Sequence, residues 1–299
     1  SDGFINDTAS RNAQISGALD FQVNSSFKLF GSLEHKNDHS NPYWGTPLVP
    51  ASFAGANAAG GIVSGSYVSN YNSTNLGNIT IDSRSLSTNY NVLDNYAKAE
   101  ENMTRAGFEW TLRDNLLLRE QAYYYTARRE WFNNEVIAFN TGTGLLDRER
   151  FFVSHDQKLL GNKAELQWDS KPAGMDNRMV TALDVSKLDF TRPGAANFPA
   201  DTVNVVDPVR GVYGLLTLQK QTTQIQNTAL SVEDRLKVTP AFALIGGLRY
   251  ETIDLDRTSV NATGANRAGF PFSKTFHPVT GRLGTTYEAL PGFTLYGQY

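Results

Sequence analysis

Apolar and polar residues alternate with a period of two along many segments of this chain, and this period constrains the fold more than any other feature. Between Asn12 and Val23 the odd positions hold Ala, Ile, Gly, Leu, Phe and Val, and the even positions are mostly polar. Successive side chains of a β-strand point to opposite faces, so the pattern is typical of strands with one apolar and one polar face. The sequence therefore predicts an all-β fold.

About ten segments carry this alternation, and we predict strands at 12–23, 27–36, 103–112, 116–128, 158–169, 177–190, 221–238, 241–254, 275–288 and 293–299. The connections alternate in length. Short ones lie at 24–26, 113–115, 170–176, 239–240 and 289–292, and long ones at 37–102, 129–157, 191–220 and 255–274. Transmembrane barrels have short periplasmic turns and long extracellular loops, whereas long structureless loops are uncommon in compact domains. The sequence thus predicts an antiparallel transmembrane β-barrel.

The predicted apolar face has an aromatic edge and one polar interruption. Six aromatic residues lie on this face close to the short connections, as in a periplasmic aromatic girdle: Phe21, Phe27, Trp110, Trp168, Phe242 and Tyr287. The alternative is the general preference of aromatic residues for strands. Asp234 interrupts the apolar face, and either a bulge or a position near the membrane interface would explain it. In the first long loop, a small hairpin is predicted around Ile79 to Ser85.

The composition excludes several classes of protein. A net charge of −3 leaves no basic footprint for nucleic acid. The mean hydropathy is −0.37, and no apolar run approaches the roughly 18 residues of a transmembrane helix. The sequence contains no phosphate-binding loop, dinucleotide-binding glycine pattern or Gly-x-Ser-x-Gly elbow. We therefore expect neither an enzyme nor a bound cofactor.

Several segments resemble TonB-dependent siderophore receptors. The stretch from Asn227 to Glu251, NTALSVEDRLKVTPAFALIGGLRYE, is similar to a barrel hairpin of that family. FHPVTGRLG, which begins at Phe276, and LPGFTLYGQY, which ends at Tyr299, are similar to the hairpin that follows. NPYWGTPL, which begins at Asn41, is similar to an extracellular-loop motif of ferric-siderophore members. The similarity covers most of the chain.

The resemblance implies a barrel of about 22 strands, an N-terminal plug domain and a TonB box. On that basis residues 1–299 are expected to form about ten strands of a partial barrel domain, with the plug outside this chain. The implied function is uptake of a ferric siderophore across the bacterial outer membrane with energy supplied through TonB. The implied partners are the ferric siderophore, outer-membrane lipids and, through the plug and TonB box, the TonB complex. Iron would enter only as part of the transported chelate.

Aromatic and basic residues near the extracellular ends are the candidate ligand-binding residues, because arginine and aromatic rings suit anionic, partly aromatic iron chelates. The candidates are Tyr43 and Trp44 in the first long loop, and Tyr123, Tyr125, Arg128, Arg129 and Trp131 toward the second. A structural role remains the alternative for each. On the polar face, residues of mixed charge are expected to form ion pairs in the lumen and to contact a plug.

Two other functions remain open at this point. A self-contained barrel of ten strands could be an outer-membrane protease, which needs paired carboxylates and a His-Asp pair high in the lumen. His155 and Asp156 are the only adjacent pair of that kind, and a surface role is expected for His155. A barrel without a plug could instead be a passive pore for small solutes.

Overall fold

A computed structural model describes residues 4–43, 45–64, 78–195 and 200–299, and one antiparallel sheet dominates it. Its strands follow one another in the order β1 (Ser10–Asn24), β2 (Phe27–Ser40), β6 (Tyr96–Arg113), β7 (Leu116–Asn140), β8 (Leu145–Ser170), β9 (Asp176–Ala195), β11 (Leu218–Lys237), β12 (Phe242–Val260), β14 (Val279–Leu290) and β15 (Phe293–Gln298). Two shorter strands join it, β10 (Ala200–Val203) beside β8 and β13 (Phe272–Phe276) beside β12. The prediction of an antiparallel all-β barrel wall of about ten strands is confirmed.

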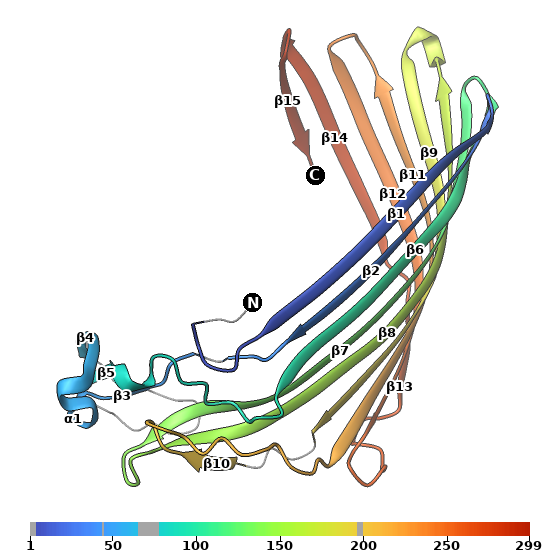
Figure 1. Cartoon of the computed structure of the whole chain (residues 1–299). Helices are drawn as coiled ribbons and strands as arrows, with labels where there is room; N and C mark the ends of the chain where they lie inside the picture. The colour runs from blue at the N-terminus through green and yellow to red at the C-terminus, as the bar shows by residue number, and fades with distance from the viewer. Residues whose placement is uncertain (1–3, 44, 65–77, 196–199) are drawn as a thin grey trace.

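The sheet is curved, and its connections separate by length (Figure 1). The short turns lie at one end, and one of them contains the 3-10 helix Pro172–Gly174. At the other end, the first long loop forms a second sheet of β3 (Leu48–Pro50), β4 (Ala58–Ser64) and β5 (Asn78–Asp82), with the helix α1 (Ala51–Ala54) and the 3-10 helices Gly55–Asn57 and Ser83–Ser85. Among the described helices, none is long and apolar enough to span a membrane.

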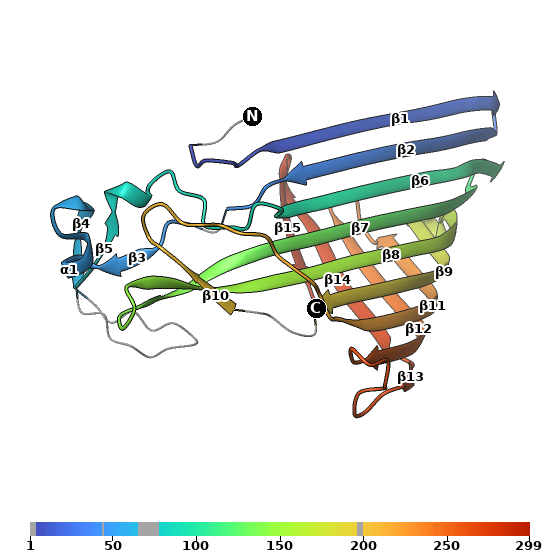
Figure 2. The same ribbon diagram turned by 60° about the horizontal axis from the view of Figure 1, so that its bottom comes forward.

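The prediction of a long loop at 129–157 is wrong, because this segment is a β-hairpin. Strands β7 and β8 contain 25 and 26 residues, and the turn between them occupies only residues 141–144. Figure 2 shows the pair projecting past its neighbours toward the small sheet. Residues 128–130 are Arg-Arg-Glu, and residues 136–139 are Val-Ile-Ala-Phe. Both faces are polar in the first run and apolar in the second, so the period-two signal disappears although the strand continues.

Two smaller predictions also need correction. The strand predicted at 275–288 is divided into β13 and β14 around Pro278, which lacks a backbone N–H for the ladder. The hairpin predicted around Ile79 to Ser85 is instead the single strand β5 followed by a 3-10 turn. β5 pairs with β3 and β4 rather than folding back on itself.

The strand register confirms that the apolar side chains share one face of the large sheet. One row of cross-strand partners runs from β1 to β14 and is apolar except at Glu120: Phe21, Leu29, Phe108, Glu120, Ala164, Leu183, Leu230, Tyr250 and Val279. On β8 this face is dominated by apolar residues from Leu160 to Trp168. Toward the loop end of the strand, the next residues on the same face are Lys158 and Asp156. This nine-residue span agrees with the roughly 9–11 residues of a transmembrane strand. Leu19 on this face is 68% exposed.

The register also explains Asp234 and Glu120, two carboxylates among the apolar residues of this face. Asp234 pairs with β9 and β12 without any register shift, so a bulge is excluded. It lies three residues from the end of β11 and accepts a 2.7 Å hydrogen bond from Asn177, which places it at the edge of the apolar band. Glu120 lies within the band, where the side-chain amide of Asn162 donates a hydrogen bond to it. Glu120 and Asp234 therefore each accept a hydrogen bond from an asparagine.

Candidate functional site

The opposite, polar face of the sheet carries several ion pairs near the short turns. Glu109 accepts from both Arg119 and Lys28, the latter at 2.8 Å. Lys163 contacts Glu165 at 2.7 Å, farther along the same face. These contacts confirm the ion pairs expected from the mixed charge of the polar face. Paired charges of this kind leave few groups free for a ligand, so the unpaired cations farther along the wall are more informative.

Toward the loop end, the polar face carries cations among aromatic rings. Arg129 lies ten residues beyond Arg119 on β7, with no register shift between them, so both point to this face. Its cross-strand partner on β8 is His155. The residues that share this region, which we call the loop-end ledge, are Arg129, Trp131, Phe151, His155, Phe190 and Arg192.

Contacts between aromatic rings and cations connect the side chains of the ledge. The Arg129 guanidinium lies 5.5 Å from the centre of the Trp131 ring. Trp131 meets Phe151 edge to face, with ring centres 5.6 Å apart. His155 lies 5.4 Å from Phe190, so it is half-buried in the ledge rather than on an open surface. Alternation along each strand brings these six residues from β7, β8 and β9 onto one surface.

The ledge is electropositive. Among the described residues, neither Arg129 nor Arg192 forms an ion pair. Burial, and then the charges of Arg192 and Arg129, lower the pKa of His155, so its imidazole is neutral at pH 7. Two uncommitted guanidinium groups beside flat aromatic rings can bind anions and stack against conjugated ring systems.

The structure separates the residues predicted as a binding site. Arg129 and Trp131 belong to the ledge, and Tyr125 lies on the same face below it. Arg128 points to the opposite face, where its side chain is 67% exposed and contacts Glu130 at 2.5 Å. Tyr43 lies in the first long loop and hydrogen-bonds Thr46. Trp44 lies outside the described residues.

Tyr123 also lies on the polar face, but in a packing role. Its cross-strand partner is Gly161, and the phenol ring occupies the space that a Cβ on Gly161 would need. Aromatic side chains commonly cover a glycine on the neighbouring strand in this way. Tyr123 therefore stabilises the β7–β8 pair below the ledge.

Beyond the ledge, the long loops pack into one body, which we call the loop cap. Its buried apolar residues come from segments far apart in sequence: Val49, Ala54, Tyr90, Phe139, Leu146, Val203 and Val205. Tyr213 is fully buried and stacks on Phe132 with ring centres 3.9 Å apart. Burial raises the pKa of Tyr213 to about 12. The hydrophobic core of this chain is therefore in the loops rather than in the large sheet.

A buried arginine holds the loop cap together. Arg148 donates two hydrogen bonds to Asp201 and a third, of 2.6 Å, to the carbonyl of Tyr90. Burial opposes the ionisation of Asp201, but Arg148, Asn134 and Arg150 outweigh it and hold the pKa of Asp201 below its ordinary value. Three chain segments thus meet at one guanidinium.

An asparagine makes the second junction of the loop cap. The Asn91 amide donates to Pro42 and Asn133, and its carbonyl oxygen accepts from the backbone N–H of Asn134. It thereby occupies the edge of β7 beyond the start of β6. Sequence reasoning missed Arg148, Asp201 and Asn91 because no short motif joins residues so far apart. It also missed Phe151, Phe190 and Arg192, which only the register brings beside Arg129.

The chain is similar to proteins of known fold. Residues 38–299 match the family described as TonB dependent receptor-like, beta-barrel. No curated protein sequence matches the chain. Among solved structures, the ferric-catecholate import receptor Fiu of E. coli K12 in its open form has a TM-score of 0.79 at 16% identity, over 100% of this chain and 48% of that one.

Two further structures have the same fold. The siderophore receptor PiuA from Acinetobacter baumannii has a TM-score of 0.72 at 15% identity, over 98% of this chain and 42% of that one. The outer-membrane ferripyoverdine receptor of Pseudomonas aeruginosa, bound to ferripyoverdine, has a TM-score of 0.69 at 12% identity, over 99% and 36%. The chain spans less than half the length of each of these structures.

Proposed function

Because this chain belongs to the TonB-dependent receptor-like β-barrel family, we propose that the full-length protein is a ferric-siderophore uptake receptor of the bacterial outer membrane. The loop-end ledge carries the proposal, since it combines aromatic rings on the polar face with two arginines that form no ion pair among the described residues. The transported chelate would bind there and move inward with energy supplied through the TonB complex. Iron is cargo in this scheme, and the chain itself needs no cofactor.

The two faces of the sheet have different roles in this proposal. The apolar band faces outer-membrane lipid, and the girdle aromatics near the short turns occupy the headgroup level. The polar face lines the lumen. Ferric catecholate chelates are anionic and carry conjugated rings, so guanidinium groups and aromatic faces supply both charge and stacking. Resemblance to receptors for ferric catecholate and ferripyoverdine supports this substrate class.

The experiment compares two adjacent arginines that point to opposite faces. Arg129→Ala in the full-length receptor should weaken binding of a ferric chelate roughly 10- to 100-fold, because a charged hydrogen bond contributes about 1.5–3 kcal/mol. Arg128→Ala is the matched control and should bind like the wild type. The double variant should match Arg129→Ala alone. Ferric catecholate, hydroxamate and citrate chelates would be titrated by tryptophan fluorescence, and an unaffected Arg129→Ala variant would exclude the ledge.

No observation favours the alternative functions. His155 and Asp156 are consecutive on β8, so they point to opposite faces, and Asp156 lies across from Arg128. No group of three or more His, Cys, Asp and Glu residues in the described part of the chain could hold a metal ion. We therefore propose a receptor rather than a protease or a passive pore.

A further inference from the structure

A cavity of about 590 Å³ lies at the short-turn end of the sheet, at the opposite end from the ledge and the loop cap. It is formed by the end of β8, the start of β9 and the end of β11, together with the turn before β7. Its charged lining consists of two carboxylates and four cations: Asp169, Asp176, Lys171, Arg178, Arg235 and Lys237. This volume is in the range of small-molecule sites.

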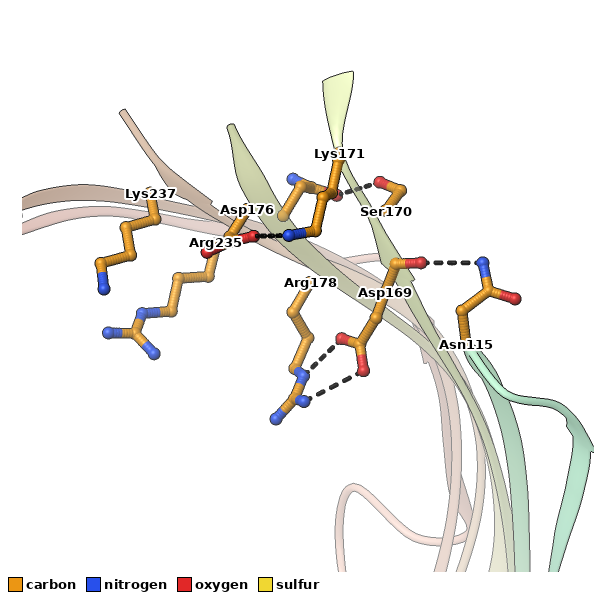
Figure 3. Close-up of a pocket in the computed structure, with 9 residues that line it drawn as sticks. Asn115, Asp169, Ser170, Lys171, Asp176, Arg178, Arg235 and Lys237 are labelled. Atoms are coloured by element: carbon orange, nitrogen blue, oxygen red, sulfur yellow. Dashed lines mark hydrogen bonds and ion pairs between the residues drawn. The ribbon is translucent and has the colours of Figure 1, made fainter. Parts of the chain in front are cut away.

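Two of the cations are committed to the two carboxylates. Arg178 makes paired hydrogen bonds of 2.7 and 3.0 Å to Asp169, and Lys171 contacts Asp176 at 2.9 Å (Figure 3). The cavity therefore has a formal excess of two positive charges, which Arg235 and Lys237 supply. Neither of these two side chains forms an ion pair with any residue that the structure describes.

The register brings like charges together at this site. Arg235 lies directly opposite Arg178 across the β9–β11 ladder, and like charges in that position repel each other. The nearest carboxylate along β11, Glu233, is bonded to Arg282. Lys237 lies opposite Asp176, whose carboxylate is held by Lys171. An anion in the cavity would relieve the repulsion that the described residues of this chain leave in place.

We propose that this cavity binds a dianionic phosphate group, with Arg235 and Lys237 as its principal donors. A phosphate monoester carries a charge of about −1.5 to −2 at neutral pH, which matches the excess of the lining. The planar guanidinium and the compact ammonium group both suit phosphate oxygens. The group could come from soluble phosphate or, because the cavity lies at the short-turn rim of the sheet, from the phosphomonoester headgroup of a lipid. The proposal is independent of siderophore binding, which we assign to the other end of the sheet.

The test uses the full-length receptor and two forms of phosphate. Inorganic phosphate is titrated by calorimetry, and phosphatidic acid in lipid nanodiscs is followed by native mass spectrometry. Arg235→Gln with Lys237→Gln should weaken whichever form binds by roughly 10- to 100-fold. Lys220→Gln with Lys274→Gln removes two cations outside the cavity lining and should leave the affinity unchanged. Lys237→Arg, which keeps the charge, should retain binding.

The outcomes are distinct. Saturable binding of inorganic phosphate that requires Arg235 and Lys237 supports a soluble ligand, and binding of phosphatidic acid alone supports a lipid. Equal affinity in the wild type and the double glutamine variant overturns the proposal, as does the absence of binding for both probes. Binding of polyglutamate without binding of phosphate also overturns it, in favour of an acidic polypeptide. Siderophore affinity, measured on the same variants, should not change and reports that the barrel is intact.

Discussion

Arg148 and Asp201 face each other across the ladder between β8 and β10 and join through two parallel hydrogen bonds of 2.9 and 2.8 Å, although the Arg148 side chain is only 1% exposed. The same guanidinium reaches the backbone carbonyls of Tyr90 and Arg210. This buried ion pair therefore connects the β7–β8 hairpin to the two loops that cover it, and Arg150 makes a further contact of 3.2 Å to the same carboxylate.

Arg148→Met should release the loop cap while the large sheet remains folded. The substitution keeps side-chain bulk but removes the buried bidentate partner of Asp201, which keeps only the contacts to Arg150 and Asn134. The expected loss is about 1.5–3 kcal/mol, so amide hydrogen exchange in residues 200–213 should accelerate roughly 10- to 100-fold. Arg178→Met breaks the exposed pair with Asp169 and should change stability by about 1 kcal/mol or less. Unchanged exchange in Arg148→Met would show that apolar packing alone holds the cap.

The pair of Glu120 and Asn162 should behave as a unit. Both lie on the apolar face, and Asn162 donates to the carboxylate. Asn162→Leu leaves Glu120 without that donor and should lower the free energy of unfolding by roughly 1–3 kcal/mol. Glu120→Leu with Asn162→Leu removes both polar groups and should be neutral or stabilising. Thermal unfolding in detergent would measure the double-mutant cycle, and additive losses would show that the two residues do not interact.

Gly161 should tolerate a side chain only when the Tyr123 ring is removed. A Cβ at Gly161 would overlap the ring, so Gly161→Ala must displace it and should cost about 1–3 kcal/mol. Adding Tyr123→Ala frees the space and should recover most of that loss. Melting temperatures of the two single variants and the double variant provide the comparison. A double variant less stable than Gly161→Ala would contradict this packing role.

The affinity for an anionic chelate should rise as the pH falls through the lowered pKa of His155. Burial and the neighbouring arginines keep the imidazole neutral in the free protein, whereas a bound anion favours its charged form. Binding therefore takes up a proton, and affinity should rise by up to about tenfold per unit of pKa shift. The readout is the ratio of wild-type to His155→Gln affinity between pH 7.5 and 5.5, because the chelate also titrates. A constant ratio would mean that His155 does not face the ligand.

Sequence reasoning located the apolar face of the large sheet accurately because each of its strands alternates apolar and polar residues with a period of two. The girdle residues Phe21, Trp110, Trp168 and Tyr287 are on the expected face near the short turns. The same reasoning failed above the apolar band, where both faces of β7 and β8 meet water or packed loops. There the alternation vanishes, and a hairpin of more than 50 residues was predicted to end in a long loop.

The candidate site likewise contains residues that the sequence predicted and residues that it did not. Residue type and position pointed to Arg129 and Trp131, and these two residues of β7 lie together on the polar face. It also pointed to Arg128, which the strand pleat sends to the other face. The partners of Arg129 on β8 and β9 could not be found from the sequence, because cross-strand neighbours follow from the register and not from spacing along the chain.

The sequence by itself determined that this chain forms two-faced antiparallel strands with connections that alternate in length, because each strand had to satisfy its two environments locally. Only the tertiary structure decided which cations remain unpaired and which loops act together. Ion pairs such as Arg148–Asp201 and Arg178–Asp169 join residues of different strands, and within the described part of the chain Arg129, Arg192, Arg235 and Lys237 are left without an ion pair. Charge can be counted along a chain, but its balance at a site depends on what the fold places opposite each group.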